Sequence, residues 1–307
     1  MARRETSNGG SLRWLPLFVL AVLFTATVQA DDYIAISDNH GRRLVDTQVD
    51  GHGSFPFLLD TAASHTVVYR KLVSDAGLTA IPLRSSTVFT ATGRREMQLY
   101  RITAVTALGR GMPVGETVAM PDPGGGPAAA YGILGADFLR GHVLVVDGER
   151  IRLLSGRAAF QPDTDADYSW QAIPGRAVGR GSVAVEVMIA GLVIPAIIDS
   201  GAAATVINPR AADRLRQDTT GDIDFNTATL SAAAGSMHAE SLHVPRLDIG
   251  GVALRDMDIL SANLPVFTTY GAARAPAMIL GADILFRQPV AIDFEHRVLY
   301  LGQHKPG

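Results

Sequence analysis

Short apolar runs rich in β-branched residues recur along most of the chain, separated by Gly, Pro or polar residues. Examples are residues 142–146, 183–189, 290–293 and 298–301. Runs of this length and composition, bounded by turn-forming residues, predict β-strands.

Helical patterns are few and short. Asn208 followed by Pro209 is a favourable N-cap and first-turn pair, which predicts a helix to about Arg216. A weaker pattern predicts a helix over residues 69–76, ended by Gly77. The whole pattern therefore predicts an all-β protein with one or two short helices in each half.

The pattern of one half returns in the other. Residues 57–63 (FLLDTAA) match 196–202 (AIIDSGA), and residues 133–139 (ILGADFL) match 279–285 (ILGADIL). Each half keeps the two motifs in the same order. Such self-similarity predicts two lobes built on one plan.

The predicted organisation has four parts, divided where the composition changes. A polar, Asp-rich stretch around residues 161–167 lies between the two copies and predicts a linker. The parts are a signal segment over 1–30, an N-terminal lobe over 31–155, a linker over 156–177 and a C-terminal lobe over 178–307.

Each half also contains a β-prone run that ends at a Gly, between its two motifs. The runs are residues 86–93 and 227–235. A β-prone run ended by Gly predicts a hairpin with its tip near that Gly. The predicted tips are Thr92–Gly93 and Ala234–Gly235.

The first 30 residues differ from the rest of the chain. Three Arg residues precede an apolar run over 14–28, which ends in small residues before Asp31. A basic start, a short apolar core and a small-residue end predict a secretory signal peptide cleaved after Ala30. The protein is then periplasmic or secreted; the alternative is an uncleaved N-terminal membrane anchor.

Composition excludes several kinds of protein. The 307 residues are 47% hydrophobic, which is enough for a core and argues against a disordered chain. With 27 Lys and Arg against 30 Asp and Glu, no basic footprint points to nucleic acid as a partner. The absence of Cys excludes disulfides, thiolate metal sites and a Cys nucleophile, and no cofactor or metal is expected.

Each half places an Asp at the end of a wholly apolar strand, followed by a hydroxyl residue and a small residue. The two triplets are Asp60–Thr61–Ala62 and Asp199–Ser200–Gly201. A buried carboxylate is costly unless it is hydrogen-bonded, and a small residue behind it lets main-chain N–H groups point at it. The hydroxyls of Thr61 and Ser200 are expected to bond to the main chain of the neighbouring lobe.

Two such Asp residues on a pseudo-twofold axis would lie nearly in contact. Like charges that close cannot both ionise, so the pair holds one proton. The ionised member can take a proton from water, and the protonated member can donate to a peptide carbonyl oxygen. The pattern predicts this acid–base chemistry at Asp60 and Asp199.

On these motifs the sequence resembles the retropepsin-like aspartic proteases, with two lobes in one chain as in pepsin-like enzymes. The resemblance implies two closed β-barrel lobes related by a pseudo-twofold. It implies a catalytic pair of Asp60 and Asp199, supported by the rest of each triplet. The Gly-tipped hairpins correspond to flaps that close over a peptide. The expected function is that of a monomeric, exported aspartic endopeptidase acting on peptides or proteins.

The sequence departs from the family pattern at two places. Ala62 stands where the family has Gly, and an Ala would strain the loop if this position required a positive φ. The alternative function is therefore a catalytically weak or inactive peptide-binding protein on the same fold. The retroviral acid–Arg pair is also missing in both lobes, which points to a different structural solution; its positions hold Ser64, Ala136, Ala203 and Ala282.

Other chemistry-bearing residues have plainer interpretations. Asp137 and Asp283 fall in a first helical turn, where an Asp caps free N–H groups. His65 is interpreted as a surface or packing residue. His238 and His243 have no carboxylate at ligand spacing, so they do not predict a metal site. The basic pair 94–95 is interpreted as solvated, and the triple Gly at 124–126 as a loop insertion.

Overall fold

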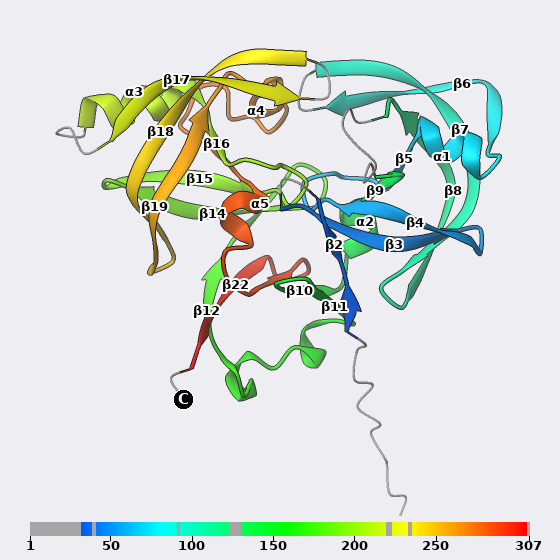
Figure 1. The fold of residues 1–307 in the computed structure, drawn as a ribbon, viewed down its shortest axis with the longest axis horizontal. Coiled ribbons are helices and arrows are strands. Elements are labelled where there is room, and N and C mark those ends of the chain that lie inside the picture. Colours follow the sequence, from blue (N-terminus) through cyan, green and yellow to red (C-terminus); the bar gives the residue numbers. More distant parts are fainter. Residues whose placement is uncertain are drawn as a thin grey trace, which may run out of the picture.

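Two lobes lie side by side above a sheet that both of them share (Figure 1). The computed structural model describes residues 32–38, 41–90, 93–122, 130–218, 223–232 and 235–305. Most of these residues are in strands, and the helices are short. The predicted two-lobed all-β fold is confirmed.

The N-terminal lobe is a sheet with the strand order β2-β3-β4-β9-β5-β8-β7-β6. An additional pairing of β3 with β7 closes the strands from β3 to β7 in this order into a barrel. The strands are β2 (Ile36–Ser37), β3 (Arg43–Val49), β4 (His52–Leu59), β5 (Val67–Tyr69), β6 (Thr79–Thr90), β7 (Gly93–Ala107), β8 (Arg110–Met120) and β9 (Gly132–Leu134).

The C-terminal lobe has the equivalent strand order, β13-β14-β15-β20-β16-β19-β18-β17, and β14 pairs with β18 to close its barrel. The two lobes therefore share one topology, as a pseudo-twofold requires. The strands are β13 (Arg176–Val178), β14 (Ser182–Ile189), β15 (Leu192–Ile198), β16 (Val206–Ile207), β17 (Asp224–Ala232), β18 (Gly235–Ile249), β19 (Val252–Ser261) and β20 (Met278–Leu280).

A third sheet joins the lobes, in the order β1-β11-β10-β21-β22-β12. Its central pair is antiparallel and combines one strand from each lobe, β10 and β21. Residues 156–177, predicted as a linker, contain the edge strand β12, and the boundaries of that segment stay a prediction. The strands are β1 (Tyr33–Ile34), β10 (Val143–Asp147), β11 (Arg150–Leu154), β12 (Tyr168–Pro174), β21 (Val290–Asp293) and β22 (Val298–His304).

Five short α-helices in the described part of the chain cap the lobes. The predicted N-cap of α3 is confirmed: the Asn208 side-chain oxygen accepts a hydrogen bond of 3.0 Å from the amide of Ala211. The helix expected over 69–76 is α1. The helices are α1 (Arg70–Asp75), α2 (Ala136–Leu139), α3 (Pro209–Asp218), α4 (Pro265–Thr269) and α5 (Ala282–Leu285), with 3₁₀ turns η1 (Arg157–Ala159) and η2 (Pro162–Thr164).

The strands that lead to the two Asp residues are buried on both faces. Residues 57–59 of β4 and 196–198 of β15 are each 5% exposed or less. A continuous apolar run, rather than an alternating one, is typical of a strand with no solvent face. Each of these strands therefore ends in the interior, where the lobes meet.

Within the described residues, no helix is long and apolar enough to cross a membrane. The predicted signal segment lies outside the described residues.

Candidate active site

Asp60 and Asp199 occupy equivalent positions at the ends of β4 and β15. A parallel strand lies beside each of them, β9 in one lobe and β20 in the other. The ladder continues through the Asp amides: Asp60 donates to the carbonyl of Leu134 (3.1 Å), and Asp199 donates to that of Leu280 (3.0 Å). The repeated Ile-Leu-Gly motif thus fixes where each Asp leaves its strand.

The Gly of that motif allows the backbone to cross directly behind the Asp loop. A Cβ atom on Gly135 would lie 2.7 Å from the carbonyl carbon of His65, and one on Gly281 would lie 2.6 Å from that of Ala204. Both neighbours are backbone atoms, which cannot move aside without disturbing the loop. Only Gly permits this approach, and this explains the repeated Gly in physical terms.

Reciprocal hydrogen bonds lock the two Asp loops together across the lobes. The Thr61 hydroxyl donates to the carbonyl of Ile198 (2.8 Å), and the Ser200 hydroxyl donates to that of Leu59 (2.7 Å). Each hydroxyl oxygen also accepts the other residue's amide, at 3.1 Å and 3.0 Å. Both side chains are buried, so these bonds are shielded from water.

We expect Ser200→Ala to destabilise the protein strongly, although the substitution removes only one oxygen atom. It leaves the amide of Thr61 and the carbonyl of Leu59 without their side-chain partner, and each buried group left unpaired costs about 1–3 kcal/mol. The measurement is the free energy of unfolding in urea. Thr47→Ala, which removes a buried hydroxyl with one bond inside its own lobe, is the matched control. Equal losses in the two variants would contradict a special role for the lock.

Each carboxyl group is held by two backbone amides of its own loop. One Asp60 oxygen, Oδ1, accepts from the amides of Ala62 (2.9 Å) and Ala63 (2.8 Å). Asp199 Oδ1 likewise accepts from the amides of Gly201 (3.0 Å) and Ala202 (2.9 Å). The other oxygen of Asp60, Oδ2, lies 2.4 Å from where a Cβ of Gly201 would be. The Asp60 carboxyl therefore lies against the opposite loop, where interaction with the Asp199 side chain lowers its pKa.

Burial dominates the electrostatics of the pair, and at Asp199 the charge of Asp60 adds to it. Desolvation raises the pKa of Asp60 above its usual value. Desolvation, followed by the charge of Asp60, raises the pKa of Asp199 to about 8. Backbone amides and the Arg42 guanidinium oppose these shifts without cancelling them. The pair therefore holds one proton near neutral pH.

The raised pKa of Asp199 predicts a stability that falls as pH rises. Above pH of about 4 the unfolded Asp releases its proton, whereas the folded pair keeps one up to about pH 8. Since the folded state binds more protons in this window, the free energy of unfolding decreases through it. At pH 8 we expect Asp199→Asn to be more stable than the wild type, with a smaller difference at pH 5. Thermal unfolding across this range is the measurement, and parallel pH curves for the two proteins would contradict the shift.

Ala62 fits its loop without backbone strain. It is not among the described non-Gly residues with positive φ, so the strain that an Ala at this position could have introduced is absent. Its side chain packs with Tyr270 against a small buried cluster of the other lobe, formed by Val178, Ala184 and Ile197. Ala62, which replaces the family's Gly, thus makes a packing contact between the lobes.

Asp137 and Asp283 are structural, although they do more than cap a helix. Asp137 accepts from the amide (2.9 Å) and the hydroxyl (2.8 Å) of Thr66, and Asp283 does the same with Thr205 (2.9 and 2.7 Å). Each Thr hydroxyl in turn accepts an amide of the Gly behind the Asp loop. This Asp–Thr pair brackets the Asp loop in each lobe, where the family's acid–Arg pair is missing.

The two hairpins extend toward each other across the top of the molecule (Figure 1). Gly93 has a φ of 134° and pairs with Thr90, and Gly235 pairs with Ala232. Helix α4 of the C-terminal lobe contacts β6, so the N-terminal hairpin reaches the other lobe. Thr92 and Ala234, predicted at the tips, lie outside the described residues.

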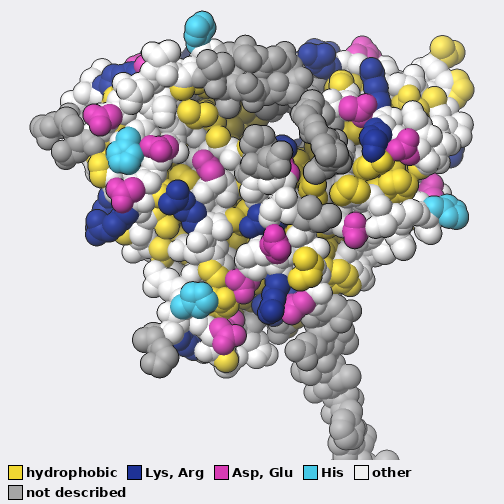
Figure 2. All heavy atoms as spheres, in the orientation of Figure 1, with side chains coloured by type: hydrophobic (Ala, Val, Ile, Leu, Met, Phe, Trp, Pro, Cys, Tyr) yellow, Lys and Arg dark blue, Asp and Glu magenta, His cyan; other side chains and the backbone are white. Residues whose placement is uncertain are grey.

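His65 and His243 bond to residues other than the Asp pair. His65 is exposed and bonds to the neighbouring Ser64 hydroxyl (2.8 Å), and His243 pairs with Asp258 on the surface (2.9 Å). In the part of the chain that the structure describes, no three His, Asp or Glu residues are grouped to hold a metal ion. On the face in Figure 2, basic and acidic side chains are interspersed, so this face carries no one-sided charged patch.

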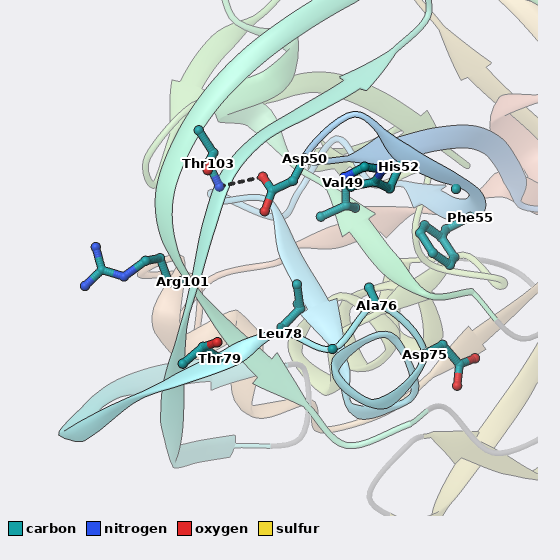
Figure 3. A pocket seen from close by; sticks show the side chains of 12 residues that line it. Val49, Asp50, His52, Phe55, Asp75, Ala76, Leu78, Thr79, Arg101 and Thr103 are labelled. Atoms are coloured by element: carbon teal, nitrogen blue, oxygen red, sulfur yellow. Dashed lines mark hydrogen bonds between the residues drawn. The ribbon is translucent and has the colours of Figure 1, made fainter.

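A hollow of about 560 Å³ lies in the N-terminal lobe, away from the Asp pair. Figure 3 shows its lining, which includes Asp50, His52, Asp75 and Arg101 and no residue of either Asp loop. The Asp50 carboxylate already accepts the amides of Thr103 (2.6 Å) and its neighbour (2.9 Å). The hollow is large, but its lining does not bring together a group of catalytic side chains. The candidate site therefore remains the Asp pair.

Two residues beside the pair were not predicted from the sequence, Arg42 and Tyr69. Arg42 approaches the carbonyl of Gly201 (3.5 Å) and pairs with Asp38 (2.6 Å). Burial and the charge of Asp60 raise the pKa of Tyr69 to about 12. Neither residue belongs to the matched motifs of the two halves, and no other signal in the sequence marks them.

Comparisons with known proteins agree with this geometry in both lobes. Residues 45–138 match the family described as "Aspartyl protease", and residues 185–287 match the family described as "gag-polyprotein putative aspartyl protease". Among solved structures, the chain is similar to the aspartic proteinase from Irpex lacteus, with 14% identity and a TM-score of 0.55. The similarity covers 90% of this chain and 97% of that one, and at this identity it shows the fold alone. Comparison with curated proteins gave no match.

Proposed function

Because the chain belongs to the retropepsin-like aspartic proteases, with two lobes in one chain as in pepsin-like enzymes, we propose that it is an exported endopeptidase. Its catalytic residues are Asp60 and Asp199. The observation that carries this proposal is their arrangement: the carboxyl groups meet, each has one oxygen fixed by two amides, and burial leaves one proton between them.

The reaction follows from that single proton. The ionised carboxylate takes a proton from a water molecule while the water oxygen attacks the carbonyl carbon of the peptide. The protonated carboxyl gives its proton to the carbonyl oxygen, which forms a neutral tetrahedral intermediate. A proton then moves from the pair to the peptide nitrogen and the C–N bond breaks. One hydroxyl of the intermediate returns its proton to the pair as the product carboxyl group forms, so the pair again holds one proton.

The remaining predicted site residues have supporting roles in this proposal. Thr61 and Ser200 hold the loops in register, and Ala62 and Gly201 supply amides to the Asp carboxylates. The two hairpin tips, including Gly93 and Gly235, contact the peptide through their backbone. The substrate is a peptide or protein, and one chain suffices for the site because both Asp residues belong to it.

The competing function is peptide binding without catalysis. The main reason to consider it is Ala62, which stands where the family has Gly. The φ of Ala62 is not positive, and this supports the protease instead. Both functions predict binding of a transition-state mimic that carries a hydroxyl between peptide-like arms. They differ in what they predict for a peptide, because only the protease cleaves it.

The test uses purified residues 31–307 with a diverse peptide library between pH 3 and 8. We expect cleavage inside peptides and inhibition by the mimic. Binding of the mimic without cleavage would favour the peptide-binding protein. Absence of both would overturn the proposed function.

Export is part of the proposal and rests on the N-terminal pattern alone. N-terminal sequencing of the protein recovered outside the cytoplasm is expected to begin at Asp31. A protein that keeps its first 30 residues and sediments with membranes would support the anchor instead.

A further inference from the structure

The carbonyl of Ala62, in the first Asp loop, accepts two hydroxyl hydrogen bonds from the other lobe. The Tyr270 hydroxyl donates at 3.0 Å, and the Ser182 hydroxyl donates at 3.2 Å. These two donors come from different elements, because Tyr270 follows α4 and Ser182 begins β14. The loop that carries Asp60 is therefore held from outside its own lobe.

Packing fixes the Tyr270 ring in the position that this bond needs. The ring lies over Gly179, where a Cβ would come within 3.1 Å of it, and Gly179 has a φ of 58°. The ring and the Ala62 methyl share the buried cluster of Val178, Ala184 and Ile197. A hydroxyl on a ring held this way is pre-organised, since little rotamer freedom is left to lose.

Ala62 connects this contact to the reacting group. Its amide donates to Asp60 Oδ1 (2.9 Å), while its carbonyl accepts from Tyr270. The two peptide groups that flank Ala62 are therefore both anchored, one on the carboxylate and one on the opposite lobe. If the carbonyl anchor is lost, the amide that orients Asp60 is free to rotate.

Among the described residues, the other Asp loop has a different contact at the equivalent carbonyl. There the Gly201 carbonyl faces the Arg42 guanidinium at 3.5 Å, and Arg42 is also paired with Asp38 at 2.6 Å. Within the described part of the chain, two neutral hydroxyls thus hold the loop of Asp60, whereas a more distant cation faces the loop of Asp199.

We infer that Tyr270 is a positioning residue for the Asp pair: by holding the Ala62 carbonyl, its hydroxyl fixes the direction of the Asp60 carboxyl group. Ser182 assists it on the same oxygen. This role rests on the proposed protease function for its kinetic consequence, although the positioning itself is a property of the fold.

The first experiment compares Tyr270→Phe with Tyr300→Phe. Tyr270→Phe keeps the ring and removes the donor, and we expect kcat to fall roughly tenfold, about the effect of one hydrogen bond on a rate, with KM unchanged. Tyr300→Phe removes a buried hydroxyl that has no partner among the described residues, and it should keep the wild-type kcat. Ser182→Ala is expected to fall between the two.

The second readout does not depend on cleavage. Carbon-13 titration of the Asp carboxyl groups reports their apparent pKa values, and the ionisable side chains facing the pair are Arg42, Tyr69 and Tyr270. We expect Tyr270→Phe to move the upper apparent pKa of the pair by at least about half a unit, because the loosened loop changes carboxylate solvation. Tyr300→Phe should leave the titration unchanged.

The outcomes separate the two claims. A Tyr270→Phe variant with wild-type kcat and wild-type titration would overturn the positioning role while leaving the protease intact. A lower melting temperature with unchanged kcat and titration would also overturn it, because it would show that the bond is only structural. A wild-type protein that cleaves nothing would overturn the protease function, and the titration would still decide the role of Tyr270.

Discussion

Replacing either Asp60 or Asp199 by Asn is expected to reduce kcat at least about 10³-fold, the size of effect that general acid–base groups supply. Asn has the shape of Asp, and its oxygen can still accept the two loop amides that hold each carboxylate. It cannot ionise or share a proton, so the water is no longer activated. Initial rates with a single cleaved peptide are the measurement.

The matched control for these variants is Asp283→Asn. Asp283 lies in the repeated motif behind the loop and bonds to Thr205, so its replacement should lower stability and leave the pH profile of cleavage in place. A single Asp60→Asn or Asp199→Asn variant that kept its activity would contradict a shared pair. The two single variants should also lose about equal activity, since neither carboxyl works alone.

Gly201→Ala is expected to reduce kcat about 100-fold, because displacing a reacting group by about 1 Å has effects of that size. The added Cβ would lie 2.4 Å from Asp60 Oδ2 and 2.5 Å from the carboxyl carbon. Two amides hold the other oxygen of Asp60, so the carboxyl group can escape the contact only by turning away from Asp199. The fold should survive, since the clash involves one side chain.

Gly111→Ala is the control for Gly201→Ala. Its Cβ would meet only the Thr106 hydroxyl at 3.6 Å, an ordinary contact, and its φ is not positive. Activity and melting temperature of Gly111→Ala should match those of the wild type. Full activity in Gly201→Ala would mean that Asp60 does not lie against the opposite loop in the working enzyme.

The local sequence pattern was enough to predict the features that depend on residues close together in the sequence. The β-branched runs became strands, Asn208 caps its helix, and the apolar strands deliver both Asp residues to one place. Each of these features is determined by a stretch of a few residues. The fact that two such stretches match made the pairing of Asp60 with Asp199 predictable as well.

Contacts between the lobes could not be predicted in the same way. Tyr270 and Ser182 meet Ala62 across 208 and 120 positions of sequence. Within the N-terminal lobe, the place of Asp137 in a helical turn likewise predicted a cap but not its bonds to Thr66, 71 positions away. Contacts between segments so far apart in the sequence depend on how their surfaces pack, which periodicity does not encode.

The shared sheet has a consequence for how the site is assembled. Its strand order is symmetric about the junction of β10 and β21, so it has the layout of a dimer interface in which both partners belong to one polypeptide. The meeting of Asp60 and Asp199 is then an intramolecular event, set by effective concentration and not by how much protein is present. A pair built this way has no dissociation constant, and extreme dilution does not take it apart.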